Sequence, residues 1–437
     1  MMDLWFSLPA AVQDSLMTLA LVMPGALAGL YILRGYAPWG LTRAILLRFR
    51  GTVAVFVVLI AASVGLGIAL SAQERGLRHG TAMAADKFDL VVAAPGSEIT
   101  AMLAAVYLQP SDMGLLDGDA YNAVATHEKV EFAAPLAFGD SYNSAPVVGT
   151  TAEFLSYLSD GVIVGRMWHD SEEAVVGALV SLEIGDTFSP AHGEGEAEEE
   201  DVHEDHHLHV VGRMAATGTP WDRAILIPIE AVWEVHGLAN GHRFGAGAQL
   251  GAPFDPEYFP GTPAIVVHPK ELWASYSLRS EFTREAQMMA FFPGTVLASL
   301  YRIMGDIRQA MSFMALVTQI LVAASVLASL FILTRLFSRT LSLLRAIGAP
   351  DRFVFAVVWS FGAALLVAGC LLGLGGGIAM AAILSAVVTA RTDIYISATL
   401  GWHEIHFVAG FVSAALILAL IPARLALKSD IVASLRG

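Results

Sequence analysis

The sequence lacks the features that would define a disulfide-stabilised protein or an ATPase. Cysteine occurs once, at Cys370, so there is no disulfide framework and no cysteine-based metal site, and we expect this residue to pack inside a helix bundle. No G-x-x-x-x-G-K-[ST] phosphate loop is present, so an ATPase that drives this chain must be a separate subunit. No nucleophile–base–acid set stands out, which argues against a hydrolase. We therefore do not expect an enzyme.

Charge is also scarce. Charged residues make up 15% of the 437 residues and hydrophobic residues 56%, a balance typical of an integral membrane protein. The formal net charge of −15 argues against a nucleic-acid partner. Residues 1–15 contain no Lys or Arg, so the basic region of a secretory signal is missing, and the first basic residue is Arg34.

Long apolar runs predict the transmembrane helices. About 20 residues at ~1.5 Å rise cross a ~30 Å hydrocarbon core, and a spanning backbone must satisfy its own hydrogen bonds, so such runs are helical. The run at 16–33 is interrupted by Pro24 and Gly25. It is either a span with its N-terminus outside, which we favour, or an interfacial or re-entrant segment. The four core spans are predicted at residues 52–70, 315–333, 353–388 and 407–421.

Basic residues beside these runs set the topology. By the positive-inside rule they mark the cytoplasmic side, and the main clusters all fall on that side if residues 73–310 lie outside. The clusters are Arg34, Arg43, Arg48 and Arg50; Arg335, Arg339, Arg345 and Arg352; and Arg424, Lys428 and Arg436.

The outer section alternates short apolar runs with Gly, Pro and Asp turns, which predicts a mixed α+β domain. The fold class is therefore a membrane α-helical bundle, with four core helices plus an N-terminal fifth, and a large α+β domain inserted after the first core helix. The predicted divisions are residues 1–50, 51–72, 73–310 with stalk helices, and 311–437. Strands are expected at DLVVAAPGS, GVIVG, EAVVGALV, HLHVVGRM, RAILIPI and PAIVV, and helices at 152–158 and 229–235.

The predicted cytoplasmic loop covers residues 335–352. The stretch FSRTLSLLRAIGAPDRFV, which begins at Phe337, has an apolar stripe at helical spacing. Phe337, Leu341, Leu344 and Ile347 form the stripe, and Gly348 and Pro350 predict where the helix stops. The helix either lies on lipid or docks on a cytoplasmic ATPase. If it docks, the contact residues are Arg339, Leu343, Leu344, Arg345, Ala346 and Gly348.

Two motifs resemble the FtsX-like/MacB-like permeases of ABC transporters. The loop resembles their R-E-I-x-x-LRA-x-GA signature, but Thr340 and Leu341 stand where the family usually has Glu and Ile. The C-terminal IPARLALKSDIVASLRG resembles their closing signature, with Ile431 in place of Pro. The matching residues are Arg339, Leu344, Arg345, Ala346, Gly348 and Ala349, then Pro422, Ala423, Arg424, Ala426, Asp430, Leu435 and Arg436.

The resemblance implies a bacterial inner-membrane protein with its large domain in the periplasm. Two such permeases would pair above two ATPase subunits, in contact with membrane lipid, and relay ATP-driven motion to the periplasmic domain. A further departure is VVWSFG around Trp359 and Ser360, where the family often has a Glu.

A tract at 191–209, within the stretch AHGEGEAEEEDVHEDHHLHVV, is rich in imidazole and carboxylate, which zinc, nickel and copper accept as ligands. It is either a solvated acidic loop or a flexible chelator that binds a divalent metal weakly. We expect no prosthetic group bound to this chain. The candidate ligands are His192, His203, His206, His207 and His209. Local hydrogen bonding is expected of His127, His169, His236, His242 and His268.

The leading hypothesis is a permease that serves zinc or divalent-metal homeostasis, with a periplasmic metal-binding or adaptor protein as partner. The alternatives are extrusion of a lipoprotein, lipid, peptide or drug, and non-transporting activation of a periplasmic wall hydrolase. The Gly-rich GLGGGIA at 373–379 lies inside an apolar run, so we expect helix packing rather than nucleotide binding.

Overall fold

The fold is taken from a computed structural model of the chain. It describes residues 5, 7–109, 111–192, 206–243, 249–302, 338–392 and 398–427, with single helical positions at 309, 313, 317, 320, 324 and 331. The chain divides into a helical unit, residues 1–77, 306–387 and 397–437, and a sheet unit, residues 78–305 with 388–396.

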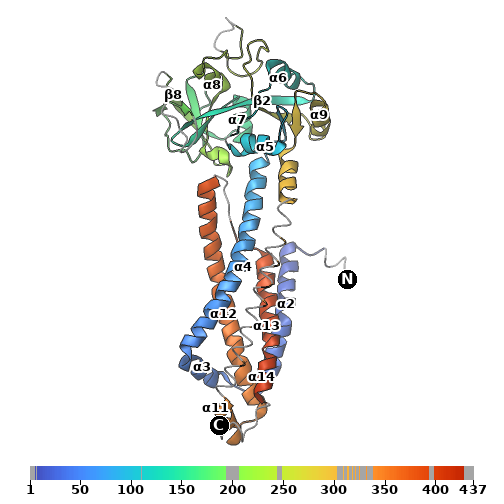
Figure 1. Cartoon of the computed structure of the whole chain (residues 1–437), viewed down its shortest axis with the longest axis vertical. Coiled ribbons are helices and arrows are strands. Elements are labelled where there is room, and N and C mark those ends of the chain that lie inside the picture. The colour runs from blue at the N-terminus through green and yellow to red at the C-terminus, as the bar shows by residue number, and fades with distance from the viewer. Residues whose placement is uncertain are drawn as a thin grey trace. The chain divides into compact units, whose positions relative to one another are not determined.

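The helical unit contains the predicted spans (Figure 1). Within the part of the chain that the structure describes, four helices are long and apolar enough to cross a membrane. They confirm the runs at 52–70, 353–388 and 407–421 and extend the N-terminal one; the run at 315–333 lies outside the described residues. The helices are α2 (Ala10–Leu33), α3 (Trp39–Arg48), α4 (Arg50–Ala85), α11 (Ser338–Ala346), α12 (Asp351–Thr392), α13 (Trp402–Leu418) and α14 (Leu420–Leu427).

Helix α2 passes through Pro24 without a break. A proline removes one backbone donor and disturbs the preceding turn, so the backbone groups nearby need other partners. Gly25 provides one, because its N–H donates to Ser413 Oγ of α13 at 2.9 Å. Its missing side chain also matters, since a Cβ there would stand 3.0 Å from the Ser413 backbone. The interruption seen in the sequence is therefore a helix contact.

Helices α4 and α12 approach each other closely through glycines. A Cβ at Gly373 would stand 2.9 Å from the Ala61 carbonyl, and one at Gly377 would stand 2.9 Å from the carbonyl of Gly65. Small residues allow such backbone contact, where van der Waals packing drives helix association in lipid. The packing role expected for the Gly-rich stretch is thus confirmed.

Trp359 occupies the region where the resembled family often carries a glutamate. Its side chain is buried, lies against Gly29 of α2, and donates from Nε1 to the Leu416 carbonyl at 3.0 Å. This position therefore joins three helices.

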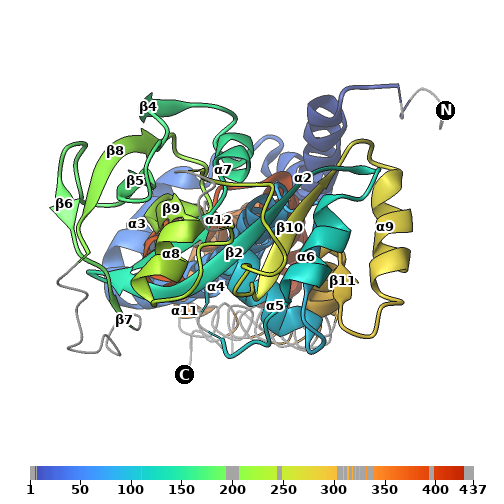
Figure 2. The same ribbon diagram turned by 90° about the horizontal axis from the view of Figure 1, so that it is seen from above.

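The sheet unit is a twisted mixed sheet, seen from above in Figure 2. Its strand order is β11-β1-β10-β2-β3-β9-β5-β8-β4, with β6 paired to β8 and β7 to β2. The pairs β3–β9 and β5–β8 are parallel. The strands are β1 (Leu90–Ala93), β2 (Val130–Tyr142), β3 (Ala145–Thr150), β4 (Ile163–Gly165), β5 (Glu173–Val176), β6 (Thr187–Phe188), β7 (Ala191–His192), β8 (Leu208–Met214), β9 (Ile225–Pro228), β10 (Ala264–Pro269) and β11 (Met289–Phe291).

Helices cover both faces of this sheet. Alternate residues of β1 show it: Leu90 and Val92 enter one core, and Val91 and Ala93 enter the other. The first core is covered by α6 (Gly118–Ala125), α8 (Ile229–Val235) and α9 (Ala274–Phe282). The second is covered by the end of α4, α5 (Glu98–Tyr107) and α7 (Ala152–Leu158).

All six strands expected from the sequence are present, and both expected helices have the predicted bounds. The sequence reading missed β2 and β3, because Pro135 and Gly139 interrupt β2. The stalk-like segment before residue 303 also differs from expectation. Pro293 begins the helix at 293–302 rather than breaking one, as suits a residue without an N–H at a first helical position.

The glycine contact gives a stability prediction. Gly377→Ala should lower the melting temperature of the full chain in lipid nanodiscs, since the added methyl meets the α4 backbone and overpacking costs roughly 1–3 kcal/mol. Gly376→Ala is the matched control, because a Cβ there meets nothing within 4 Å. Equal melting temperatures for the two variants would contradict the contact.

Candidate functional site

The C-terminal end of α11 forms a rigid turn. The Gly348 N–H donates to the Arg345 carbonyl at 3.0 Å, and the Ala349 N–H to the Leu344 carbonyl at 2.9 Å. These are the two bonds of a Schellman motif, which requires a left-handed residue, and Gly348 has φ +102°. Helix α12 then begins at Asp351, after Pro350. The predicted stop at Gly348 and Pro350 is confirmed.

Arg345 holds this turn to the bundle rather than pointing outward. Its Nε donates to Asp351 Oδ1 at 2.8 Å, and Nη1 to the Leu427 carbonyl at 3.4 Å. The side chain is 15% exposed. It therefore fixes α11 against the first turn of α12 and the end of α14.

The apolar residues of α11 divide into two groups. Leu344 is half-buried against the helical core. Leu343 and Ile347 are 55% and 75% exposed and stand one turn apart on the same face. Ala346 and Gly348 are exposed as well. Arg339 lies in α11, and its side chain is outside the described part of the structure.

The predicted metal ligands lie around the gap at 193–205. His192 ends β7 with its side chain undescribed, and His203 lies outside the described residues. His207 and His209 each contact a hydroxyl through Nδ1, Ser189 Oγ at 3.0 Å and Thr187 Oγ1 at 2.9 Å. Among the described residues, no group of three or more His, Cys, Asp or Glu could hold a metal ion.

The other histidines make local contacts, as expected from the sequence. The partners are Glu281 for His127, the Met167 carbonyl for His169, the Val232 carbonyl for His236, Glu230 for His242 and Asp89 for His268.

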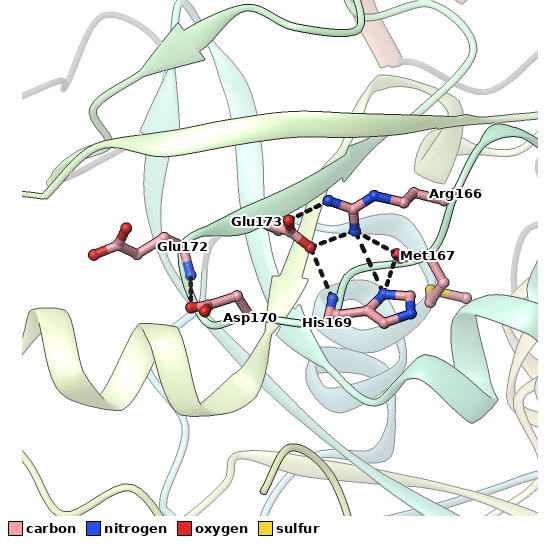
Figure 3. A network of polar contacts seen from close by, with 6 residues as sticks. All are labelled: Arg166, Met167, His169, Asp170, Glu172 and Glu173. Carbon is pink, nitrogen blue, oxygen red and sulfur yellow. Dashed lines mark hydrogen bonds and ion pairs between the residues drawn. The ribbon is translucent and has the colours of Figure 1, made fainter. Parts of the chain in front are cut away.

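A polar network stands beside the C-terminal end of the His/acid tract (Figure 3). Arg166 grips the Glu173 carboxylate with both terminal nitrogens, Nη1 at 2.6 Å from Oε2, and the His169 N–H donates to the same oxygen at 2.8 Å. Glu173 pairs in register with His209. The Arg166 hydrogen bond, chiefly, lowers the pKa of Glu173 to about 2. The carboxylate is thus ionised at neutral pH.

A second polar cluster, which the sequence reading missed, joins α4 to α13. The Glu404 side chain is 1% exposed, accepts from Arg75 Nη1 at 2.7 and 2.9 Å, and accepts from Ser71 Oγ at 2.7 Å. The Gly401 N–H donates to its other oxygen at 2.8 Å, which closes the start of α13. In the sequence, this cluster could have been suspected from two opposite charges: Arg75 follows the apolar run 52–70, and Glu404 precedes the run 407–421.

Known proteins resemble this chain in two ways, in the sequence of its C-terminal part and in structure. Residues 312–431 match the family model described as FtsX-like permease C-terminal. The periplasmic region of MacB from Actinobacillus actinomycetemcomitans aligns at 10% identity over 48% of this chain and 92% of that chain, with a TM-score of 0.30. The extracellular domain of the noncanonic ABC-type transporter YknZ from Gram-positive bacteria aligns at 9% identity over 46% and 98%, with a TM-score of 0.27. No curated protein matches.

The four long apolar helices and the separate sheet unit define a multi-pass membrane protein that also carries a large α+β domain. The family match then shows that residues 312–431 are similar to the C-terminal part of FtsX-like permeases. This confirms the resemblance drawn from the two sequence motifs. It also agrees with the predicted location, the bacterial inner membrane with a periplasmic domain.

The Arg166–Glu173 pair predicts a pH-dependent contribution to stability. The folded pKa of Glu173 is lowered from 4.5 to about 2, so its stabilisation is present above pH 4.5 and is lost as the pH falls towards 2. Glu173→Gln should therefore lower the melting temperature of the detergent-solubilised chain at pH 7, and the difference from wild type should shrink below pH 4.5. The exposed Glu172, as Glu172→Gln, is the control. A difference that persists unchanged at pH 2.5 would contradict the assignment.

Proposed function

We propose that this chain is the permease subunit of an ABC transporter that relays motion from a separate cytoplasmic ATPase to its periplasmic sheet domain. The observation that carries the proposal is the exposed apolar pair Leu343 and Ile347 on a fixed turn of α11. An exposed apolar pair beside a bundle marks a contact surface, and i, i+4 anchors on one helix face fit a groove in a partner.

The turn suits force transfer because it is held at three places. The Schellman bonds fix its backbone, and Arg345 ties it to Asp351 and to the Leu427 carbonyl. A push on α11 therefore acts on α12 and α14 together. In this proposal Arg345 positions the coupling helix, and Leu343, Ala346 and Ile347 make the contact.

Helix α4 supplies the path towards the outer domain. It runs from Arg50 to Ala85 as one helix, and the residues after it enter the sheet core. Phe88 is buried against Phe154 and Trp221, with ring centroids 5.7 and 5.9 Å away. Thr81 bonds to Tyr301 of the helix at 293–302, and Tyr107 of α5 donates to the Thr81 carbonyl at 2.8 Å. A displacement of α4 is thus passed to both neighbouring helices of the sheet unit.

The coupling helix also suggests how many subunits assemble. A coupling helix on each permease copy suits a homodimer above two ATPase subunits, with the basic ends of the spans on the cytoplasmic side.

The coupling surface can be tested by charge insertion. Leu343→Asp and Ile347→Asp should each weaken binding of the nanodisc-embedded chain to its ATPase by about tenfold or more, since an anchor residue contributes on the order of 2 kcal/mol. Binding is measured by co-sedimentation with the purified ATPase, together with the ATP hydrolysis rate.

Leu272→Asp is the matched control, because Leu272 is 78% exposed in the sheet unit. Both coupling variants should melt like wild type. Undiminished ATPase binding by the α11 variants would remove the coupling proposal.

We further propose that the cargo or signal is a divalent metal, with zinc as the leading candidate. Support comes from the two histidines at the end of the tract. His207 and His209 each engage a hydroxyl through Nδ1, which leaves Nε2 as the ligating nitrogen, and metal-binding histidines commonly have their other ring nitrogen held in this way. A dense acidic environment suits weak capture and release.

Zinc titration of the full chain in nanodiscs tests the metal link. Wild type should bind zinc, and the double variant His207→Gln with His209→Gln should bind fewer ions, since two imidazole ligands are lost. His127→Gln is the control, because its partner is Glu281. A wild-type chain that binds no zinc would end this part of the proposal.

A further inference from the structure

Helix α3 is held between two membrane spans. Helix α2 ends at Leu33 and α4 begins at Arg50, and both are long and apolar enough to cross a membrane. Only residues 34–38 precede α3, and Phe49 alone follows it. Its 10 residues, at ~1.5 Å rise, make a helix about 15 Å long, so neither end can move far from the edge of the hydrocarbon layer. Helix α3 is therefore kept at the depth of the lipid headgroups.

One face of α3 packs on the helical bundle. Thr42 is fully buried, and Ile45 and Leu46 are partly buried against the bundle core. The loop before α3 is held as well, because the ring centroids of Tyr36 and Phe353 of α12 are 6.2 Å apart. Since Phe353 stands close to the turn between α11 and α12, α3 and α11 lie at the same end of the helical unit (Figure 1). This packing decides which face of α3 is free.

The free face of α3 combines apolar and cationic side chains. Trp39 and Leu47 are 60% and 62% exposed, and Arg43, also exposed, stands four residues from each of them. Residues four apart share a helix face, so these three side chains form one stripe. Exposed tryptophan beside arginine is typical of the membrane interface, where the indole ring sits at headgroup level. The stripe thus has the composition of a surface that meets lipid.

The charge along this segment is of one sign. Four exposed arginines belong to α3 or flank it, namely Arg34, Arg43, Arg48 and Arg50. No Asp or Glu occurs from residue 15 to residue 73. Within the part of the chain that the structure describes, none of the four arginines forms an ion pair. The positive charge at headgroup depth is therefore available to an anion that comes from outside the chain.

We propose that α3 is a binding surface for the phosphate groups of anionic phospholipids. All the basic residues of this segment are arginine, whose planar guanidinium bonds to phosphate bidentately. Each basic side chain at an anionic membrane surface strengthens binding roughly fivefold. Trp39 and Leu47 lie beside the guanidinium groups and contact the upper part of the acyl chains. This inference goes beyond the coupling proposed for α11, because it requires no ATPase.

The position of α3 favours lipid over an acidic protein surface as the occupant. Headgroups surround any helix at this depth, so a protein partner would first have to displace them. The exposed Trp39 and Leu47 also need apolar cover, which acyl chains supply and a charged protein surface does not. Charge and apolar exposure therefore indicate the same ligand.

The test embeds the full chain in nanodiscs of phosphatidylcholine with a minor fraction of phosphatidylglycerol, and one of the two lipids carries bromine on its acyl chains. Bromine quenches tryptophan fluorescence at short range. The chain has eight tryptophans, so the Trp39 signal is the difference between wild type and Trp39→Phe. Quenching at equal fractions of brominated lipid should show that the surroundings of Trp39 prefer phosphatidylglycerol by about tenfold or more.

The double variant Arg43→Gln with Arg48→Gln, made with and without Trp39→Phe, should lower this preference by about tenfold. Both arginines are exposed, so the variant should fold like wild type. Arg352→Gln with Arg424→Gln is the matched control, because it removes the same charge from exposed positions at the same end of the bundle, on α12 and α14. The control should keep the wild-type preference.

Equal quenching of Trp39 by the two brominated lipids in wild type would overturn the inference, and this measurement involves no charge variant. An equal loss of preference in the control would show a general charge effect and would overturn it too. If the α3 variant keeps the lipid preference but loses ATPase binding, the surface serves a protein and the lipid site falls. The coupling proposal fails separately, because its readout is ATPase binding by Leu343→Asp and Ile347→Asp.

Discussion

The close contact between α4 and α12 is the constraint on which the helical unit depends. Gly65 lies against Gly373 and Gly377, and Ile60 lies where a side chain on Gly369 would stand. Lipid gives helices no hydrophobic reason to associate, so backbone proximity and dense packing must supply the attraction. The contact fixes α4 against the bundle. Within the sheet unit, Thr81 of the same helix bonds to Tyr301.

Polar groups fix the ends of the helices that packing alone would leave free. Glu404 collects donors from Arg75, Ser71 and the Gly401 backbone, and so links the start of α13 to α4. Arg345 of α11 likewise donates to Asp351 of α12 and to the Leu427 carbonyl of α14, and so links these three helices. A charge with several hydrogen bonds tolerates burial that an isolated charge would not.

The coupling helix shows how far sequence reasoning reaches. The stop at Gly348 followed from local chemistry, because a left-handed turn favours glycine and proline cannot continue the helix. The orientation of Arg345 did not follow, since its partners Asp351 and the Leu427 carbonyl come together only in the folded bundle. Strand β2 was missed for a related reason. Pro135 argues against a central strand, yet it lies in the half of β2 that pairs with β10 alone, and β3 pairs only from Ala137 onward.

The sequence by itself determined the spans, the outer α+β section and the family motifs, because hydrophobic length, turn residues and helix stops are local properties. Only the tertiary structure decided that Leu343 and Ile347 are exposed while Leu344 is half-buried, and that Glu404 meets Arg75 across two helices. It also brought Arg166 and Glu173 together with the backbone of His169 in one network. Strand register and helix packing fix such pairings, and neither can be read from one segment alone.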